Sequence, residues 1–322
     1  MNALLMPFSL RVLSFAIVVL YTYKTLKSSM YCGPTLFSST VPFAMFSRIH
    51  HVSANSWKYF KREGTRGFLI RLAKEVPYRL SRCRSWFRNQ LVGQFVEVCG
   101  NKWKLDGLTY SFDTPAISRT VKSRFVWGTY EDKERRLVEQ HVPADLPVIE
   151  GGGSIGVISN VINRKLSHPE NHIVIEANPD LLPVLEANRT LNDAKYEIVH
   201  AALDPNGPEV TFYLHKLSVG GSVQRATGSA VTVPAVTVGG LIKEKGWDKV
   251  SLVIDIEGGE LDLIEKEQEV LKNHVAVFIV EVHHMISDAQ DIKKAIQTIE
   301  RLGFTFKEEQ TDVYVYYNEN LL

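Results

Sequence analysis

The sequence predicts an α/β fold: a doubly wound parallel sheet with a terminal antiparallel hairpin, preceded by a basic helical N-terminal arm. Three observations support it. At residues 148–165 a strand pattern ends in a glycine turn and passes directly into an apolar-periodic helix. Strand and helix patterns then alternate as far as residue 302, which is typical of wound sheets. The segments 249–256 and 275–282 are continuous apolar runs, as expected for strands covered on both faces.

Composition and charge separate the chain into an arm and a body. The 322 residues are 45% hydrophobic, enough for one α/β core with additional segments. Residues 1–90 contain fourteen Lys and Arg against two acids, a net charge of +12, and the other 23 basic and 34 acidic residues give −11. The three cysteines show no Cys-x-x-Cys spacing, so we expect neither a disulfide framework nor a zinc site.

The first 30 residues form an apolar segment with three interpretations. Its uninterrupted part, residues 12–23, is shorter than the ~20 apolar residues that span a bilayer. We interpret the whole segment as a membrane anchor, as a targeting segment, or as sequence upstream of a later translation start at Met30 or Met45. We expect a cytoplasmic protein, membrane-associated through this segment if it is an anchor.

Residues 31–92 are a basic linker with amphipathic helices. Leu69 and Leu72 share one helical face, and Pro77 breaks the pattern. The arm either packs on the body with its basic side in solvent, or residues 1–90 bind an anionic membrane surface. Nucleic acid is not expected as a partner, because the body is acidic and nothing downstream reads bases.

Residues 93–322 form the predicted catalytic domain, with its core from about residue 120. It begins with a small β-meander and a charged helix. Trp127 and Tyr130, just before that helix, either line a substrate entrance or pack in the core. The meander strands are expected at 95–98, 102–105 and 108–112, and the charged helix at 131–141. Later strands are expected at 172–176, 196–200, 231–236, 249–256 and 275–282, and later helices at 154–165, 180–191, 237–245, 259–272 and 287–302. The terminal hairpin is expected at 304–306 and 313–317.

The glycine turn at residues 151–156 predicts a cradle for a nucleotide-type cofactor. Glycines let a ligand approach the backbone, and the helix that follows presents free N–H groups. Gly151-x-Gly153-x-x-Gly156 fits the dinucleotide fingerprint. Counted from Glu150, the same turn fits the acid-led loop of S-adenosylmethionine enzymes. Glu176, at the end of the next strand, suits the ribose hydroxyls of either cofactor.

Further carboxylates follow the apolar strand at 249–256. Asp255 and Glu257 lie at the carboxyl end of this strand without a local neutralising partner, so a functional role is expected. His283 ends the neighbouring strand and is a candidate general base. Glu260 suits the start of a helix and is interpreted as structural. Because ligation by Asp255, Glu257 and His283 would need a geometry that the pattern does not indicate, no metal site is expected.

These segments together resemble one family. Glu150-Gly-Gly-Gly-Ser-Ile-Gly156, Glu176-Ala-Asn-Pro179, Asp255-Ile-Glu-Gly-Gly-Glu260 and Glu281-Val-His283 occur in this order. Their order and spacing, with Gly128-Thr-Tyr-Glu131 upstream, resemble the FkbM-type S-adenosylmethionine-dependent methyltransferases over roughly residues 120–320. Two departures are mild: Glu150 replaces the commoner Asp, and Gly153-Ser154 replaces Ala-Asn.

The resemblance implies a Rossmann-like class I methyltransferase (EC 2.1.1 class). The reaction it implies is O-methylation of a hydroxyl on a saccharide, glycolipid or small natural product, with S-adenosyl-L-methionine as cofactor. Two alternatives are an NAD(P)-dependent oxidoreductase using the same loop and a membrane-associated, non-catalytic interaction protein. The resemblance and the motifs assign the cofactor to Glu150, Gly151, Gly152, Gly153, Gly156, Glu176, Asn178, Ala202 and Asp255, and catalysis to Asp255, Glu257 and His283.

Removal of residues 1–55 tests the role of the arm. We expect the truncated protein to bind its cofactor as tightly as the full chain and to sediment less with membranes, since the apolar segment and part of the basic arm are gone. Cosedimentation of both proteins with membranes is the measurement. Equal membrane-bound fractions would contradict the anchoring role.

Overall fold

The computed structural model describes residues 84–214, 221–222, 229–256, 258–283 and 288–322, with the backbone alone at 221–222. The chain divides into two units, residues 1–80 and 81–322, and all described residues belong to the second. The apolar segment and most of the basic arm lie outside the described residues. No helix in the described ranges is both long and apolar enough to cross a membrane.

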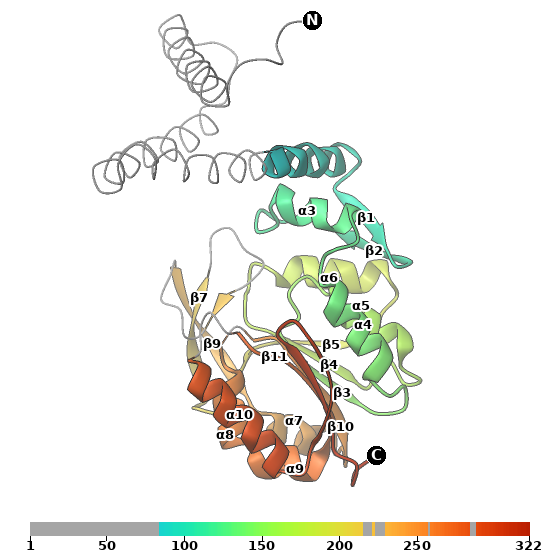
Figure 1. Cartoon of the computed structure of the whole chain (residues 1–322). Helices are drawn as coiled ribbons and strands as arrows, with labels where there is room; N and C mark the ends of the chain where they lie inside the picture. The colour runs from blue at the N-terminus through green and yellow to red at the C-terminus, as the bar shows by residue number, and fades with distance from the viewer. Residues whose placement is uncertain (1–83, 215–220, 223–228, 257, 284–287) are drawn as a thin grey trace, which may run out of the picture. The chain divides into compact units, whose positions relative to one another are not determined.

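A seven-stranded mixed sheet forms the centre of the second unit (Figure 1). The strands from β11 to β5 are parallel, whereas β13 is antiparallel to both β11 and β12. This confirms the wound sheet and its terminal hairpin. In sheet order the strands are β12 (Thr305–Gln310), β13 (Val313–Tyr317), β11 (Val275–Glu281), β10 (Val250–Ile254), β3 (Val148–Gly151), β4 (His172–Glu176) and β5 (Glu197–His200).

The winding direction reverses between β3 and β10. From β3 the chain adds β4 and β5 on one side, then returns to add β10 and β11 on the other. In open α/β sheets such a reversal leaves a crevice at the carboxyl ends of the strands, and ligands bind there. The glycine turn after β3 and Asp255 after β10 both lie at this position.

Helices cover both faces of the sheet (Figure 1). Successive strand residues point to opposite faces, and Val148 and Ile149 accordingly belong to two different hydrophobic clusters. Each cluster is completed by the apolar sides of the helices on its face. One cluster includes α4 (Asp132–His141), α5 (Val157–Lys165) and α6 (Leu182–Leu191), and the other includes α7 (Val238–Lys245), α8 (Glu260–Lys266), α9 (Gln268–His274) and α10 (Ala289–Arg301).

Two of these helices correct the sequence prediction. The helix expected from residue 154 begins at Val157, because Gly156 is its N-cap in a left-handed conformation with φ of 81°. The single helix expected at 259–272 is divided at Glu267 into α8 and α9. The Glu267 carboxylate accepts hydrogen bonds from the backbone N–H groups of Val238 and Gly239, so it caps the start of α7.

The region before the sheet also differs from the prediction. Residues 84–98 are helical, so the strand expected at 95–98 is wrong and the meander is reduced to the hairpin of β1 (Lys102–Leu105) and β2 (Leu108–Ser111). Glu97, on this helix, pairs with Arg119 and Lys122 of α3 (Arg119–Val126). These pairs link the helix to α3, and Val96, next to Glu97, is fully buried.

A smaller sheet stands beside the main one. It has the order β6 (Ala202–Leu203), β9 (Ser229–Val236), β7 (Glu209–Leu214) and β8 (Gly221–Ser222). The strand expected at 231–236 exists as β9, but it pairs here instead of in the wound sheet. Ala202, Phe212 and Val233 form its small buried core.

Candidate active site

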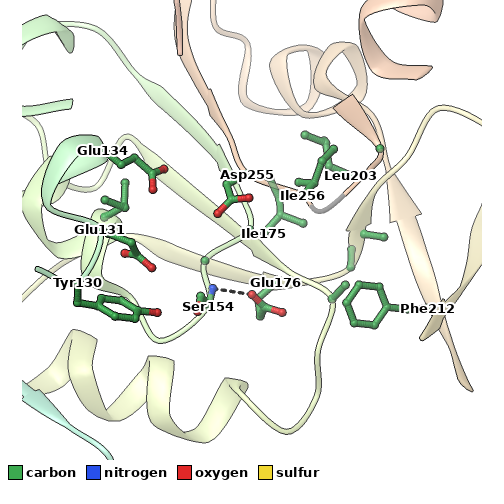
Figure 2. A pocket seen from close by; sticks show the side chains of 17 residues that line it. Tyr130, Glu131, Glu134, Ser154, Ile175, Glu176, Leu203, Phe212, Asp255 and Ile256 are labelled. Atoms are coloured by element: carbon green, nitrogen blue, oxygen red, sulfur yellow. Dashed lines mark hydrogen bonds between the residues drawn. The ribbon is translucent and has the colours of Figure 1, made fainter. Parts of the chain in front are cut away.

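A pocket opens at the carboxyl edge of the sheet, where the winding reverses (Figure 2). The turn after β3, the ends of β4 and β10, the start of α4 and the small sheet all contribute to it. Four carboxylic acids line it, and none of its described lining residues is Lys or Arg. Its lining is Tyr130, Glu131, Glu134, Gly152, Gly153, Ser154, Ile158, Ile175, Glu176, Ala177, Ala201, Ala202, Leu203, Phe212, Asp255, Ile256 and Gly259.

The turn after β3 can be built only from very small residues. A Cβ on Gly152 would lie 1.9 Å from the backbone oxygen of Asp255, and Gly152 has φ of 93°. A Cβ on Gly153 would lie 2.4 Å from Val174 Cγ1. Ser154 has a left-handed φ of 48° although it is not glycine, a conformation that costs energy and is often found at functional sites.

The backbone N–H groups of this turn are used inside the protein. Those of Gly152 and Gly153 both donate to the carbonyl of Ile175, at 2.9 and 3.0 Å. That of Ser154 donates to Glu176 Oε2 at 2.6 Å (Figure 2). The expected seat for an anionic group at the helix start near Ser154 is therefore occupied by the Glu176 carboxylate.

Glu176 is the most constrained acid in the pocket. Its Oε1 accepts a second backbone hydrogen bond, from Asn178 at 2.6 Å, and the residue is 6% exposed. Burial raises the pKa of Glu176 to about 7, and the backbone N–H groups of Asn178 and Ser154 oppose this rise. The carboxyl group is thus held in one position and titrates near neutral pH.

Glu150 lies outside the described pocket lining. Its Oε1 accepts a hydrogen bond from the Ser159 hydroxyl at 2.7 Å, and its Oε2 lies 3.0 Å from His172 Nε2. All three side chains are almost completely buried. These contacts join α5 and β4 to β3 through Glu150, and its contact with the cofactor stays a prediction.

The other predicted cofactor residues divide into two groups. Gly152, Gly153, Glu176, Ala202 and Asp255 line the pocket, whereas Gly151, Gly156 and Asn178 do not. The two glycines serve packing, since a Cβ on Gly151 would lie 3.0 Å from Leu203 Cδ2 and one on Gly156 would lie 2.9 Å from Leu185 Cδ1. Asn178 acts through its backbone N–H, which orients Glu176.

The structure brings two of the three predicted catalytic residues together. His283 Nε2 lies 3.4 Å from Asp255 Oδ1, and His283 Nδ1 lies 2.8 Å from Glu260 Oε1. Glu260 is fully buried and also accepts from the N–H of Gly258. We assign the proton of the neutral ring to Nδ1, which donates to Glu260, so that Nε2 faces Asp255. Glu257 lies outside the described residues.

Two acids at the start of α4 are functional candidates that the sequence analysis missed. Glu131 has a left-handed φ of 47°, and burial raises its pKa to about 7, although the Tyr130 hydroxyl opposes this through a hydrogen bond. Burial and the neighbouring carboxylates, Asp255 first, raise the pKa of Glu134 well above its usual value. Glu134 shares a helix face with Leu137 and Val138, and a charged residue on an apolar face was the available signal.

Arg135 places these acids by holding the loop before α4. Its guanidinium donates to the carbonyls of Tyr130 and Gly128, both at 3.0 Å, and pairs with Asp106. Tyr130 is buried and lines the pocket, whereas Trp127 is 49% exposed. Of the two aromatic residues considered for a substrate entrance, only Tyr130 is in the described lining.

Residues 150–306 match the Methyltransferase FkbM domain. This part of the chain is an FkbM methyltransferase domain. The match begins at the end of β3 and includes the glycine turn, Glu176, Asp255 and His283. The methyltransferase family that the motifs resembled is therefore confirmed, and the pocket belongs to the FkbM domain together with the start of α4.

Solved structures similar to the chain include other methyltransferases. Precorrin-6y C5,15-methyltransferase from Geobacter metallireducens is 12% identical over 58% of this chain and 87% of that one, with a TM-score of 0.33. The ribosomal protein L11 methylase from Lactobacillus delbrueckii subsp. bulgaricus is 14% identical over 58% and 77%, with a TM-score of 0.35. The Pyrococcus abyssi tRNA (uracil-54, C5)-methyltransferase, in complex with S-adenosyl-L-homocysteine, is 9% identical over 67% and 43%, with a TM-score of 0.37. No curated protein matches the chain in sequence.

The buried position of Glu150 predicts a large effect on stability. Glu150→Ala leaves Ser159 and His172 without their buried partner, so we expect the free energy of unfolding to fall by about 3 kcal/mol. Denaturant titration is the measurement. The matched control is Glu170→Ala, because Glu170 pairs with His168 at the surface, where such a change costs at most about 1 kcal/mol. Equal losses in the two variants would contradict the structural role.

Proposed function

We propose that the FkbM domain binds S-adenosyl-L-methionine in this pocket and transfers its methyl group to a hydroxyl of a saccharide, glycolipid or small natural product. The observation that carries the proposal is the pocket's charge. Glu131, Glu134, Glu176 and Asp255 line it without any Lys or Arg in the described lining. A sulfonium cation is attracted to such a site, whereas an anionic cofactor is repelled by it.

The arrangement of the turn supports this cofactor over a dinucleotide. Dinucleotide sites bind pyrophosphate through free N–H groups at the helix start. Here Gly152 and Gly153 donate to Ile175, and Ser154 donates to the carboxylate of Glu176. A pyrophosphate would meet an acidic residue in place of free donors, which argues against the oxidoreductase alternative.

The remaining walls suit the other parts of the cofactor. Glu176 presents a fixed carboxyl group that can accept hydrogen bonds from the two ribose hydroxyls. Ala202, Leu203 and Phe212 form an apolar wall, which suits the faces of an adenine ring. The acids of α4 and Asp255 lie on the other side of the turn (Figure 2), where we place the sulfonium.

The reaction needs a base and a dry, aligned site. When bound, S-adenosyl-L-methionine supplies a methyl group to the acceptor oxygen and leaves as a neutral thioether, so the acceptor's O–H proton must go to a base. His283 is the proposed base, with Nε2 toward Asp255 and its tautomer held by Glu260. Alignment of the reacting atoms can contribute about 7–11 kcal/mol. Glu257 stays a predicted catalytic residue.

Calorimetric titration of the purified full-length chain tests the proposal. We expect S-adenosylhomocysteine to bind at one site per chain and NAD to bind much more weakly, for the electrostatic reason given above. Binding of NAD without binding of S-adenosylhomocysteine would support the oxidoreductase. Binding of neither would support the non-catalytic interaction protein.

The pKa of Glu176 predicts a pH-dependent affinity. Since the folded-state pKa is about 7 and the ionised form accepts hydrogen bonds from hydroxyls better, affinity for S-adenosylhomocysteine should rise with pH up to about 7 and then level off. Between pH 6 and pH 8 the gain should approach about tenfold. Calorimetry at several pH values is the measurement.

Two variants identify the group whose titration causes the pH dependence of the affinity. Glu176→Gln should bind more weakly at pH 8 and lose most of the pH dependence. Glu131→Gln removes the other pocket acid with a pKa of about 7 and should keep most of it. A full pH dependence in Glu176→Gln would show that a different group titrates.

The localisation is also a proposal. We propose a cytoplasmic enzyme whose N-terminal segment, outside the described residues, associates with an anionic membrane surface. The net charge of +12 in residues 1–90 supports this. Membrane attachment would favour a lipid-linked saccharide as acceptor.

A further inference from the structure

Three carboxylates converge at one side of the pocket. Asp255 follows β10 and Glu281 ends β11, and these parallel strands are paired in register up to Ile254 and Val280, so the two acids leave the sheet side by side. Glu134 reaches the same point from the first turn of α4. One oxygen from each of the three groups lies within 4.8 Å of the others.

Glu134 is the residue that a structural role does not explain. It is 7% exposed, and its carboxylate points toward Asp255 (Figure 2). Among the described residues, no hydrogen-bond donor or cationic side chain pairs with its carboxylate. A buried carboxylate without a partner is costly, so this position is expected to be retained for a ligand.

We infer that Glu134, Asp255 and Glu281 form a binding site for a divalent metal ion of the oxygen-preferring class, such as Mg²⁺ or Mn²⁺. Hard cations of this class bind carboxylate oxygens and keep several waters, so three protein ligands leave positions for water or for an acceptor hydroxyl. The three oxygens lie within 4.8 Å of one another, so small side-chain movements would bring all of them to the distance of about 2.1 Å at which a single such ion binds. This departs from the sequence analysis, which expected no metal site.

Charge balance favours a divalent ion over the sulfonium alone. The three carboxylates carry a charge of −3 when ionised, and the proposed cofactor brings one positive charge on sulfur. A divalent cation would neutralise the remainder. It would also lower the pKa of an acceptor hydroxyl bound to it, so that the proton leaves more readily to His283 and the oxygen can attack the methyl group.

A second cluster, Asp255 with Glu260 and His283, has similar oxygen and nitrogen separations but is already satisfied. Glu260 is bonded to His283 Nδ1 and to the N–H of Gly258. A metal there would have to break both hydrogen bonds. In the cluster that includes Glu134, the Glu134 carboxylate has no hydrogen-bond partner among the described residues that a metal would displace.

Titration of the metal-free full-length chain with Mn²⁺ tests the inference. Binding is measured by calorimetry and by the electron paramagnetic resonance signal of free Mn²⁺. We expect one Mn²⁺ per chain, displaced by Mg²⁺, and a rise in Tm with Mn²⁺. Glu134→Gln and Glu281→Gln should each weaken Mn²⁺ binding at least tenfold. Glu139→Gln, on the exposed side of the same helix, is the matched control and should bind as the unchanged chain does.

The melting temperature without metal separates lost binding from lost folding. Glu134→Gln keeps the size of the side chain and breaks no hydrogen bond among the described residues, so its metal-free Tm should be close to that of the unchanged chain. Equal Mn²⁺ affinity in Glu134→Gln, or loss of binding in Glu260→Gln but not in Glu134→Gln, would overturn the inference. So would the absence of Mn²⁺ binding to the unchanged chain.

Only the ion's role in methyl transfer rests on the proposed function, because the Mn²⁺ titration needs no methyl donor. If S-adenosylhomocysteine binds and Mn²⁺ does not, the metal site alone is wrong. If Mn²⁺ binds and S-adenosylhomocysteine does not, the proposed methyl transfer is wrong and the metal site stands.

Discussion

The contact between Gly152 and the backbone of Asp255 is the constraint on which the pocket depends. The Asp255 carbonyl lies where any side chain on residue 152 would begin, and the Asp255 N–H donates to Gly151 at 2.9 Å. The ends of β3 and β10 are thus held together by backbone alone. Because this contact fixes where both strands stop, it also fixes the position of Asp255, and the turn that follows β3 holds Glu176 through the N–H of Ser154.

The concentration of acidic side chains in the pocket follows from that geometry. Parallel strands that end together deliver their last side chains to one small volume, and here those side chains are acidic. The fold tolerates this because each carboxylate has a different environment. Glu176 is held by two N–H groups, Glu260 lies within hydrogen-bond distance of His283 Nδ1, and Glu134 has neither arrangement. The acid with the least support is therefore the most informative about what the pocket binds.

The sequence predicted the sheet well because its strands are local signals. The apolar runs of β10 and β11 and the turn after β3 can each be recognised without knowledge of their neighbours. Features that depend on distant partners could not be recognised in this way. The helix at 84–98 pairs with α3 through Glu97, and Glu267, where α8 and α9 are interrupted, caps α7.

The distinction between local signals and distant partners applies to the residues of the site as well. Glu176 and Asp255 follow strands that point to the sheet edge, so their place in the pocket was predictable. Glu150 has the same sequence context, but Ser159 and His172 are arranged around it in space. Glu134 lies in a helix of mostly charged residues, and only its alignment with Leu137 and Val138 distinguished it from the exposed charged residues of that helix.

The separate pairing of the small sheet has a consequence for the pocket. Among the described strands, β6, β7, β8 and β9 form no hydrogen-bonded pair with the seven-stranded sheet, yet Ala202 and Phe212 supply one wall of the pocket. That wall can diverge in length and shape while the strand register beneath the glycine turn stays unchanged. Changes in the length or shape of the small sheet therefore leave in place the strand ends that position Glu176 and Asp255, and this wall can vary independently of the acids of the pocket.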